Sequence, residues 1–123
     1  MKNITQILLI VCGAFLMNSC YYDEIELSPD IPTNPDEPGF VKVKYGDDIQ
    51  PIWNAKCTGC HNENNKLDLQ PEVSFNELVP EYVYANDADN SPLYIKLDTG
   101  HGGASSDNMQ QIKAWINQGA ENN

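Results

Sequence analysis

The chain has 123 residues, 41% of them hydrophobic, and a formal net charge of −11, because 18 acidic residues stand against seven lysines and no arginine. Nucleic acids are bound mainly through Lys and Arg side chains that neutralise phosphates, so this balance argues against a nucleic-acid partner. It points instead to soluble or basic partners.

The beginning of the chain has the pattern of a secretion signal. Lys2 gives a short positive start, and the apolar run that follows suits a signal sequence and is short for a membrane span. Residues 16–20 then resemble the lipobox of bacterial lipoproteins. This pattern predicts that residues 1–19 are removed and that Cys20 is lipidated, which would anchor the protein in the bacterial cell envelope, on either face of the outer membrane. An ordinary secretory signal with an incidental cysteine is the alternative.

Residues 20–39 have the composition of a tether. Prolines recur every three residues from position 29 to position 38, which aligns them along a polyproline II rod, and acidic residues lie between them. A segment with so few apolar residues cannot bury a core, and its like charges repel, so we expect it to be disordered and extended. Its acidic start, at positions 23 and 24, resembles the surface-export signals of lipoproteins of the Bacteroidetes group. The folded domain is then expected to span residues 40–123.

The stretch Cys57-Thr58-Gly59-Cys60-His61 has the Cys-x-x-Cys-His spacing of covalent haem attachment. Two thiols one helical turn apart can form thioether bonds with the two vinyl groups of one porphyrin edge, and the adjacent histidine can bind the iron. The motif therefore predicts one covalently bound haem c, held by Cys57, Cys60 and His61.

Other interpretations of this cysteine pair stay open. A zinc ion could take Cys57, Cys60, His61 and His101 as ligands, although the adjacent Cys60 and His61 fit one tetrahedral metal poorly and no second Cys-x-x-Cys follows. A thioredoxin-like dithiol would require apolar strands, which the sequence does not show. A plain structural disulfide is the remaining possibility.

Around the motif, the spacing of apolar residues predicts short helices and little strand. The first helix would be capped by Asp47 or Asp48 and would lead directly into Cys57. The second would begin at Ser74, whose side chain would form a capping box with that of Glu77.

The third and fourth helices follow in the C-terminal part of the chain. The third would begin at the Ser91-Pro92 pair and the fourth near Ser105 or Ser106, with glycines that forbid regular structure in between. The fourth would end at Gly119 and would bury one apolar stripe. That stripe consists of Met109, Ile112, Trp115 and Ile116.

Three stretches resemble the small cytochrome c domains of bacterial lipoproteins and, more distantly, class I cytochromes c. They are residues 48–53 leading into the haem motif, residues 91–94 and residues 112–120, and they come in the family's order. The resemblance covers nearly all of residues 45–123. It implies an all-α fold of about four short helices around one haem, in which the first and last helices cross and the haem lies in a slot between them.

The sixth ligand of the iron is the point on which the chain departs from this family. The family places a methionine in a loop before the last helix, whereas the loop of residues 97–104 has no methionine and contains His101. We expect His101 to be the distal ligand, which would give a lower potential than His/Met ligation. Met109 is the alternative, but its helical register with Ile112 is typical of a core residue. An open or water-bound site is the third possibility.

The function that these patterns predict is transfer of single electrons between two redox proteins, a donor and an acceptor. We do not expect an enzyme, because electron transfer at a haem edge needs no general acid, base or nucleophile. A haem-based sensor or peroxidase-like protein with an open distal site is the first alternative, and a zinc-stabilised interaction module is the second. For the haem carboxylates, Trp53 and Lys56 are the nearest donors in sequence.

Overall fold

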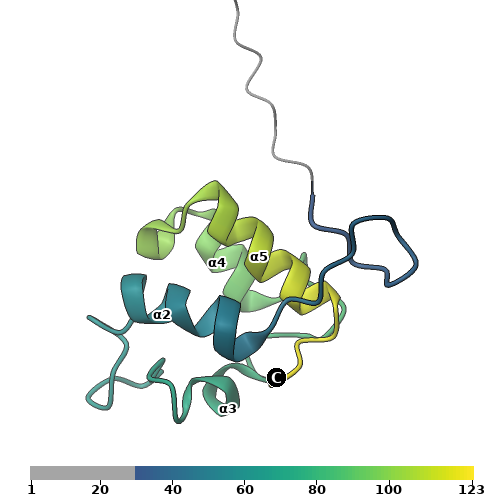
Figure 1. Ribbon diagram of the computed structural model, residues 1–123. Helices are drawn as coiled ribbons and strands as arrows, with labels where there is room; N and C mark the ends of the chain where they lie inside the picture. The colour runs from purple at the N-terminus through teal and green to yellow at the C-terminus, as the bar shows by residue number, and fades with distance from the viewer. Residues whose placement is uncertain (1–29) are drawn as a thin grey trace, which may run out of the picture.

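The computed structural model describes residues 30–123 (Figure 1). The expected signal peptide, the lipidation site Cys20 and residues 20–29 of the expected tether lie outside the described residues. Within residues 30–123 the chain is helical and contains no β-strand, and its α-helices are α2, α3, α4 and α5. The expectation of an all-α domain with four short helices is therefore confirmed.

The first helical segment consists of a π-helical turn, η1 (Tyr45–Ile49), followed by α2 (Gln50–Lys56). Pro51 lacks an N–H, and its ring would crowd a carbonyl one turn earlier in a regular α-helix. The wider turn just before it relieves this conflict. Asp48 accepts a hydrogen bond from the Lys44 N–H (2.8 Å), but the N-cap of the segment is Lys44, three residues before Asp47 and four before Asp48.

The second helix, α3 (Ser74–Leu78), lacks the expected capping box. Val73 occupies the N-cap position and makes no side-chain cap, while Ser74 lies inside the helix and is fully buried. Its hydroxyl bonds to Tyr45 and Gln50 instead of the helix backbone. The capping-box prediction was wrong because the Ser74 hydroxyl forms hydrogen bonds with buried side chains outside the helix, and so is not available to cap α3.

The third helix, α4 (Pro92–Asp98), begins after Ser91 with proline in its first turn, as expected. A three-residue 3-10 turn, η2 (His101–Gly103), follows it, and Gly102 within this turn has non-helical angles, in keeping with the expectation that the glycines interrupt regular structure. Three of these glycines, Gly100, Gly102 and Gly103, have positive φ angles, which residues with a Cβ rarely adopt.

The last helix, α5 (Ser106–Asn117), starts and stops as its sequence predicts. Ser105 caps it and accepts a hydrogen bond from the Asn108 N–H (3.2 Å), while the Asn108 side chain accepts one from the Ser105 N–H. Gly119 follows its end with a φ of 106°. The predicted stripe is buried at Ile112, Trp115 and Ile116.

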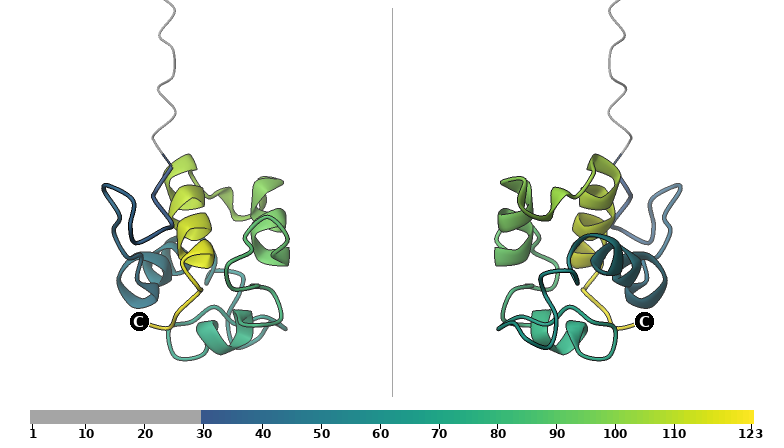
Figure 2. Two further views of the ribbon diagram at one scale, coloured as in Figure 1. Left: turned by 90° about the vertical axis from the view of Figure 1, so that its right-hand side faces the viewer. Right: turned by 90° about the vertical axis from the view of Figure 1, so that its left-hand side faces the viewer.

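The core is built where η1 and α4 pack against α5 (Figure 2). The Tyr45 and Trp115 rings lie 5.1 Å apart, centroid to centroid, and Phe75 contacts both. The first helical segment thus contacts the last helix through η1. The largest fully buried apolar side chains are Trp53, Trp115, Ile49, Leu78, Ile112, Ile116 and Val83.

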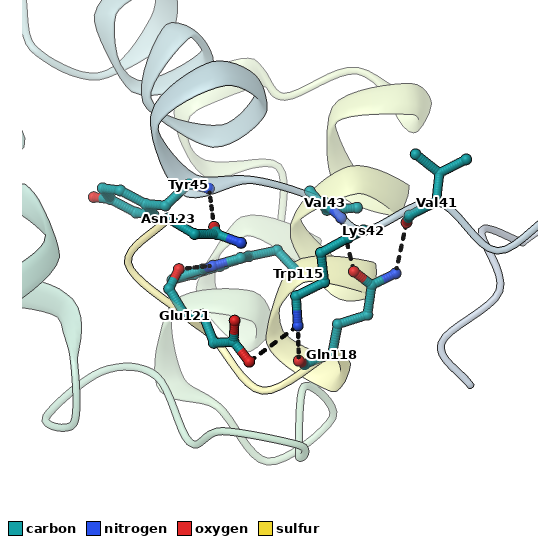
Figure 3. A network of polar contacts seen from close by, with 8 residues as sticks. All are labelled: Val41, Lys42, Val43, Tyr45, Trp115, Gln118, Glu121 and Asn123. Carbon is teal, nitrogen blue, oxygen red and sulfur yellow. Dashed lines mark hydrogen bonds and ion pairs between the residues drawn. The ribbon is translucent and has the colours of Figure 1, made fainter. Parts of the chain in front are cut away.

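Pro32, Val41 and Val43, in the segment before η1, are hydrogen-bonded to Gln118 at the end of α5. The Gln118 side chain donates to the carbonyls of Pro32 (3.0 Å) and Val41 (3.1 Å). It also accepts a hydrogen bond from the Val43 N–H (2.8 Å), as Figure 3 shows. Ile31 packs against the core. Of the residues that the composition assigned to the tether, Ile31 and Pro32 therefore contact the domain, and residues 33–39 are exposed.

Candidate functional site

An apolar pocket of about 450 Å³ lies beside the haem motif. Its volume is within the range of pockets that bind small molecules and cofactors, roughly 300–1,000 Å³. The wall comes from α2, the loop after it, Tyr82, α4 and η2. The lining residues are Trp53, Lys56, Cys57, Cys60, His61, Leu67, Leu69, Tyr82, Pro92, Leu93, Lys96, Leu97, His101 and Gly102.

No residue of α5 lines this pocket. The resemblance implied a slot between the first and last helices, whereas the pocket opens between α2 on one side and α4 with η2 on the other. The reason is that the buried stripe of α5 already packs on η1 and the aromatic cluster around Trp115. The pocket beside the motif therefore lies next to the third helix, and not in the slot between the first and last helices that the resemblance implied.

The three motif residues reach the pocket because the chain turns tightly at the end of α2. Cys57 closes the helix with a bond to the Trp53 carbonyl (2.8 Å), and the N–H groups of Cys60 and His61 both donate to the Cys57 carbonyl. Cys57 is buried and Cys60 is exposed, and both thiols are free. Burial raises the pKa of the Cys57 thiol. Redox-active dithiols need a lowered pKa, so this environment does not favour a thioredoxin-like site.

His61 is held by a backbone carbonyl. Its Nδ1 lies 3.2 Å from the carbonyl oxygen of Leu67. A carbonyl can only accept, so Nδ1 is the donor in this contact, and in the neutral imidazole Nε2 then keeps its lone pair. Metal-binding histidines are commonly oriented in this way by a carbonyl on the other ring nitrogen.

His101 comes to the same pocket from η2. The His61 and His101 rings lie 6.0 Å apart, centroid to centroid, with their planes at 74°. Two imidazoles on opposite sides of one metal ion have centroids about 6 Å apart, since each bond is about 2.0 Å and each ring centre lies roughly 1.1 Å beyond its nitrogen. The backbone of η2 also approaches the motif, because a Cβ on Gly102 would lie 3.9 Å from the Cys57 sulfur.

Met109, the alternative distal ligand, is not part of the pocket wall. It lies on α5, is partly buried and packs against the core. The arrangement therefore brings together Cys57, Cys60, His61 and His101, and leaves Met109 with the hydrophobic core.

The pocket was also considered as a site for a metal ion without a porphyrin, such as zinc. Nowhere in residues 30–123 do three His, Cys, Asp or Glu side chains gather in a group that could hold a metal ion. The four residues considered for zinc line one pocket without forming a zinc site. Haem needs only two axial ligands from the protein, because the porphyrin supplies the other four nitrogens, so the histidine pair is sufficient for it.

Two charged side chains line the pocket, Lys56 and Lys96, and no acidic residue does. The sequence indicates Lys56, because it lies next to Cys57. It does not indicate Lys96, because α4 reaches this wall only in the folded chain.

The other donor expected from the sequence, Trp53, is fully buried, and its Nε1 has no hydrogen-bond partner. That nitrogen lies near the Tyr45 hydroxyl and lowers its pKa slightly against the larger rise caused by burial.

Sequence reasoning also missed the role of the Leu67 carbonyl. Two leucines at alternate positions in a polar loop, Leu67 and Leu69, indicate that the loop packs against something, and both side chains line the pocket. Their spacing carries no information on a backbone acceptor, however. Only the path of the loop back over His61 brings that carbonyl to the imidazole.

No protein-family model, curated protein or solved structure matches this chain. None of the helices in residues 30–123 is long and apolar enough to cross a membrane.

Proposed function

We propose that this protein is a c-type cytochrome that carries single electrons through one covalently bound haem. The observation that carries the proposal is the convergence of Cys57, Cys60 and His61 with His101 in one apolar pocket, with the two imidazoles 6.0 Å apart. The motif alone specifies one axial ligand. The pocket supplies a partner for it from a segment forty residues later.

Six residues of the pocket wall have a role in this proposal. The Cys57 and Cys60 thiols would add to the haem vinyl groups and hold it covalently, and His61 and His101 would bind its iron. The haem, when bound, supplies a one-electron iron couple. Lys56 and Lys96 are the cations of the wall that can pair with its carboxylates.

A carrier is favoured over a sensor or a peroxidase-like enzyme because both axial positions have a candidate ligand. An imidazole at the distal position leaves no site for a small ligand or peroxide. The proposed partners are one redox protein that donates electrons and another that accepts them. The proposed location is the cell envelope, with the lipid on Cys20 as the anchor.

The test is expression of the full chain in cells that mature cytochromes c. We expect one haem per polypeptide that remains attached after acid–acetone extraction and adds the mass of one haem. Replacing both motif cysteines, Cys57→Ala with Cys60→Ala, should abolish the attachment.

The matched control replaces a cysteine outside the motif. Cys20→Ala should prevent lipidation and leave the covalent haem in place. A wild-type chain that stays colourless in these cells would overturn the proposal. Zinc bound by that colourless chain with one ion per molecule would instead support the interaction module.

A further inference from the structure

A chain of buried hydrogen bonds runs from η1 to the loop that holds His61. The Tyr45 hydroxyl donates to Ser74 Oγ (2.7 Å), and Ser74 Oγ donates to Gln50 Oε1 (2.5 Å). Gln50 Nε2 then donates to the Leu69 carbonyl (3.0 Å). All three side chains are at least 94% buried, since their exposed fractions are 3%, 0% and 6%.

The chain ends on a residue that is tied directly to His61. The Leu69 N–H donates to the His61 carbonyl (3.1 Å), while the Leu69 carbonyl accepts from Gln50. Two residues earlier, the Leu67 carbonyl meets His61 Nδ1. Gln50 therefore holds the short loop of residues 67–69, which contains the Leu67 carbonyl that accepts the His61 Nδ1–H hydrogen bond.

The polar groups of Gln50 are fully engaged, which fixes the direction of its amide. Nε2 donates to the Leu69 carbonyl and to Asn54 Oδ1 (3.0 Å), and Oε1 accepts from Ser74. Burial raises the pKa of Tyr45, so its hydroxyl keeps its proton and remains the donor at the start of the chain. Buried polar networks of this kind specify one arrangement, because each member would be costly to leave unpaired.

We propose that Gln50 and Ser74 are positioning residues for His61, acting through the loop of residues 67–69. This inference rests on the proposed function, in which His61 is an iron ligand. A firm bond from Nδ1–H to the carbonyl makes an imidazole more basic and stabilises ferric iron. Gln50 and Ser74 thus help to keep the reduction potential low, although neither touches the pocket.

The experiment compares two buried glutamines in the haem-loaded protein. Gln50→Met removes the donor to the Leu69 carbonyl with little change in volume. Gln118→Met removes the bonds to Pro32, Val41 and Val43, none of which belongs to the His61 loop. Both variants should be less stable. Only Gln50→Met should raise the reduction potential, by about 30 mV, which corresponds to a threefold change in the reduced-to-oxidised ratio at 59 mV per tenfold.

A second readout reports on the hydrogen bond itself. In the reduced protein, the His61 Nδ1–H proton should exchange with solvent faster in Gln50→Met than in the wild type or in Gln118→Met. Ser74→Ala keeps Gln50 but releases its amide oxygen, so it should shift the potential in the same direction by a smaller amount. It also serves as the test if Gln50→Met fails to fold.

The possible failures are distinguishable. A wild-type chain without covalent haem overturns the proposed function and this inference together. Haem-loaded Gln50→Met or Ser74→Ala with the potential and proton exchange of the wild type overturns the inference alone. An equal shift in Gln118→Met also overturns it, since the effect would then follow stability and not position.

Discussion

His61 and His101 are held in different ways, and this difference predicts which side of the proposed haem site is easier to change. His61 is fixed by the turn after α2 and by the Leu67 carbonyl. His101 is exposed in a three-residue turn between glycines with positive φ. An exposed ligand on a short glycine turn has fewer contacts to lose, so the distal side should be the more deformable of the two.

Replacing the distal histidine tests the ligand assignment directly. We expect His101→Ala to convert a low-spin bis-histidine spectrum to one with an open position, and the ferrous protein to bind carbon monoxide. Met109→Leu should leave the spectrum and the potential unchanged, because Met109 does not line the pocket. The opposite result, with Met109→Leu altering both and His101→Ala altering neither, would contradict the assignment. Absorption spectroscopy with a redox titration makes the measurement.

The buried thiol of Cys57 gives the haem-free protein a specific pH dependence. Burial raises its pKa above the ordinary value of 9.0, so the folded chain holds this proton more tightly than the unfolded chain. The resulting stability is complete below pH 9.0 and is lost as the pH rises through the folded-state value. Urea unfolding at pH 7 and pH 10 should therefore show a smaller alkaline loss for Cys57→Ala than for the wild type. Equal losses would mean that the buried thiol does not titrate with folding.

At the scale of elements, sequence patterns predicted a helix boundary correctly where the capping residue bonds to its own helix. Ser105 caps α5 and Gly119 ends it, because nothing else competes for those residues. Ser74 had an equally clear local pattern, but its hydroxyl is bonded to Tyr45 and Gln50. The sequence could not show this, since those partners lie 29 and 24 residues away.

For the candidate site, the sequence likewise predicted the residues that belong to a local motif, but not those that tertiary packing adds. The motif indicated Cys57, Cys60 and His61, and the single other histidine left His101 as the candidate partner. The contributions of α4 and of the Leu67 carbonyl depend on how the elements pack, which no local pattern encodes. The hydrogen bond to the Pro32 carbonyl could not be predicted either, because its donor, Gln118, lies 86 residues along the chain.

The N-cap of α5 is expected to contribute measurably to the free energy of unfolding. Ser105→Ala removes the acceptor for the Asn108 N–H and should lower the free energy of unfolding by about 1 kcal/mol. Ser106→Ala, one residue later and exposed, is the matched control and should be nearly neutral. Urea titration followed by circular dichroism measures both. Equal losses in the two variants would show that the cap is not the source of the effect.

At the scale of the whole molecule, a small domain surrounds an apolar pocket. Residues 30–123 form one core cluster, and several of its members, among them Trp53, Cys57, Leu69 and Leu97, also line the pocket. Domains of this size are marginal when a core alone must stabilise them. A haem that fills the pocket would cover this apolar surface and stabilise the fold as any ligand of the native state does.

Removing the cofactor should therefore cost the domain much of its stability. The double variant Cys57→Ala with Cys60→Ala, purified without haem, should melt at least about 10 °C below the haem-loaded wild type, since about 2 kcal/mol suffices for such a shift in a domain of this size. Haem-free wild type from cells that lack the maturation system controls for the two substitutions and should melt near the variant. Differential scanning calorimetry makes the comparison. A haem-free wild type as stable as the loaded protein would contradict the view that the cofactor completes this core.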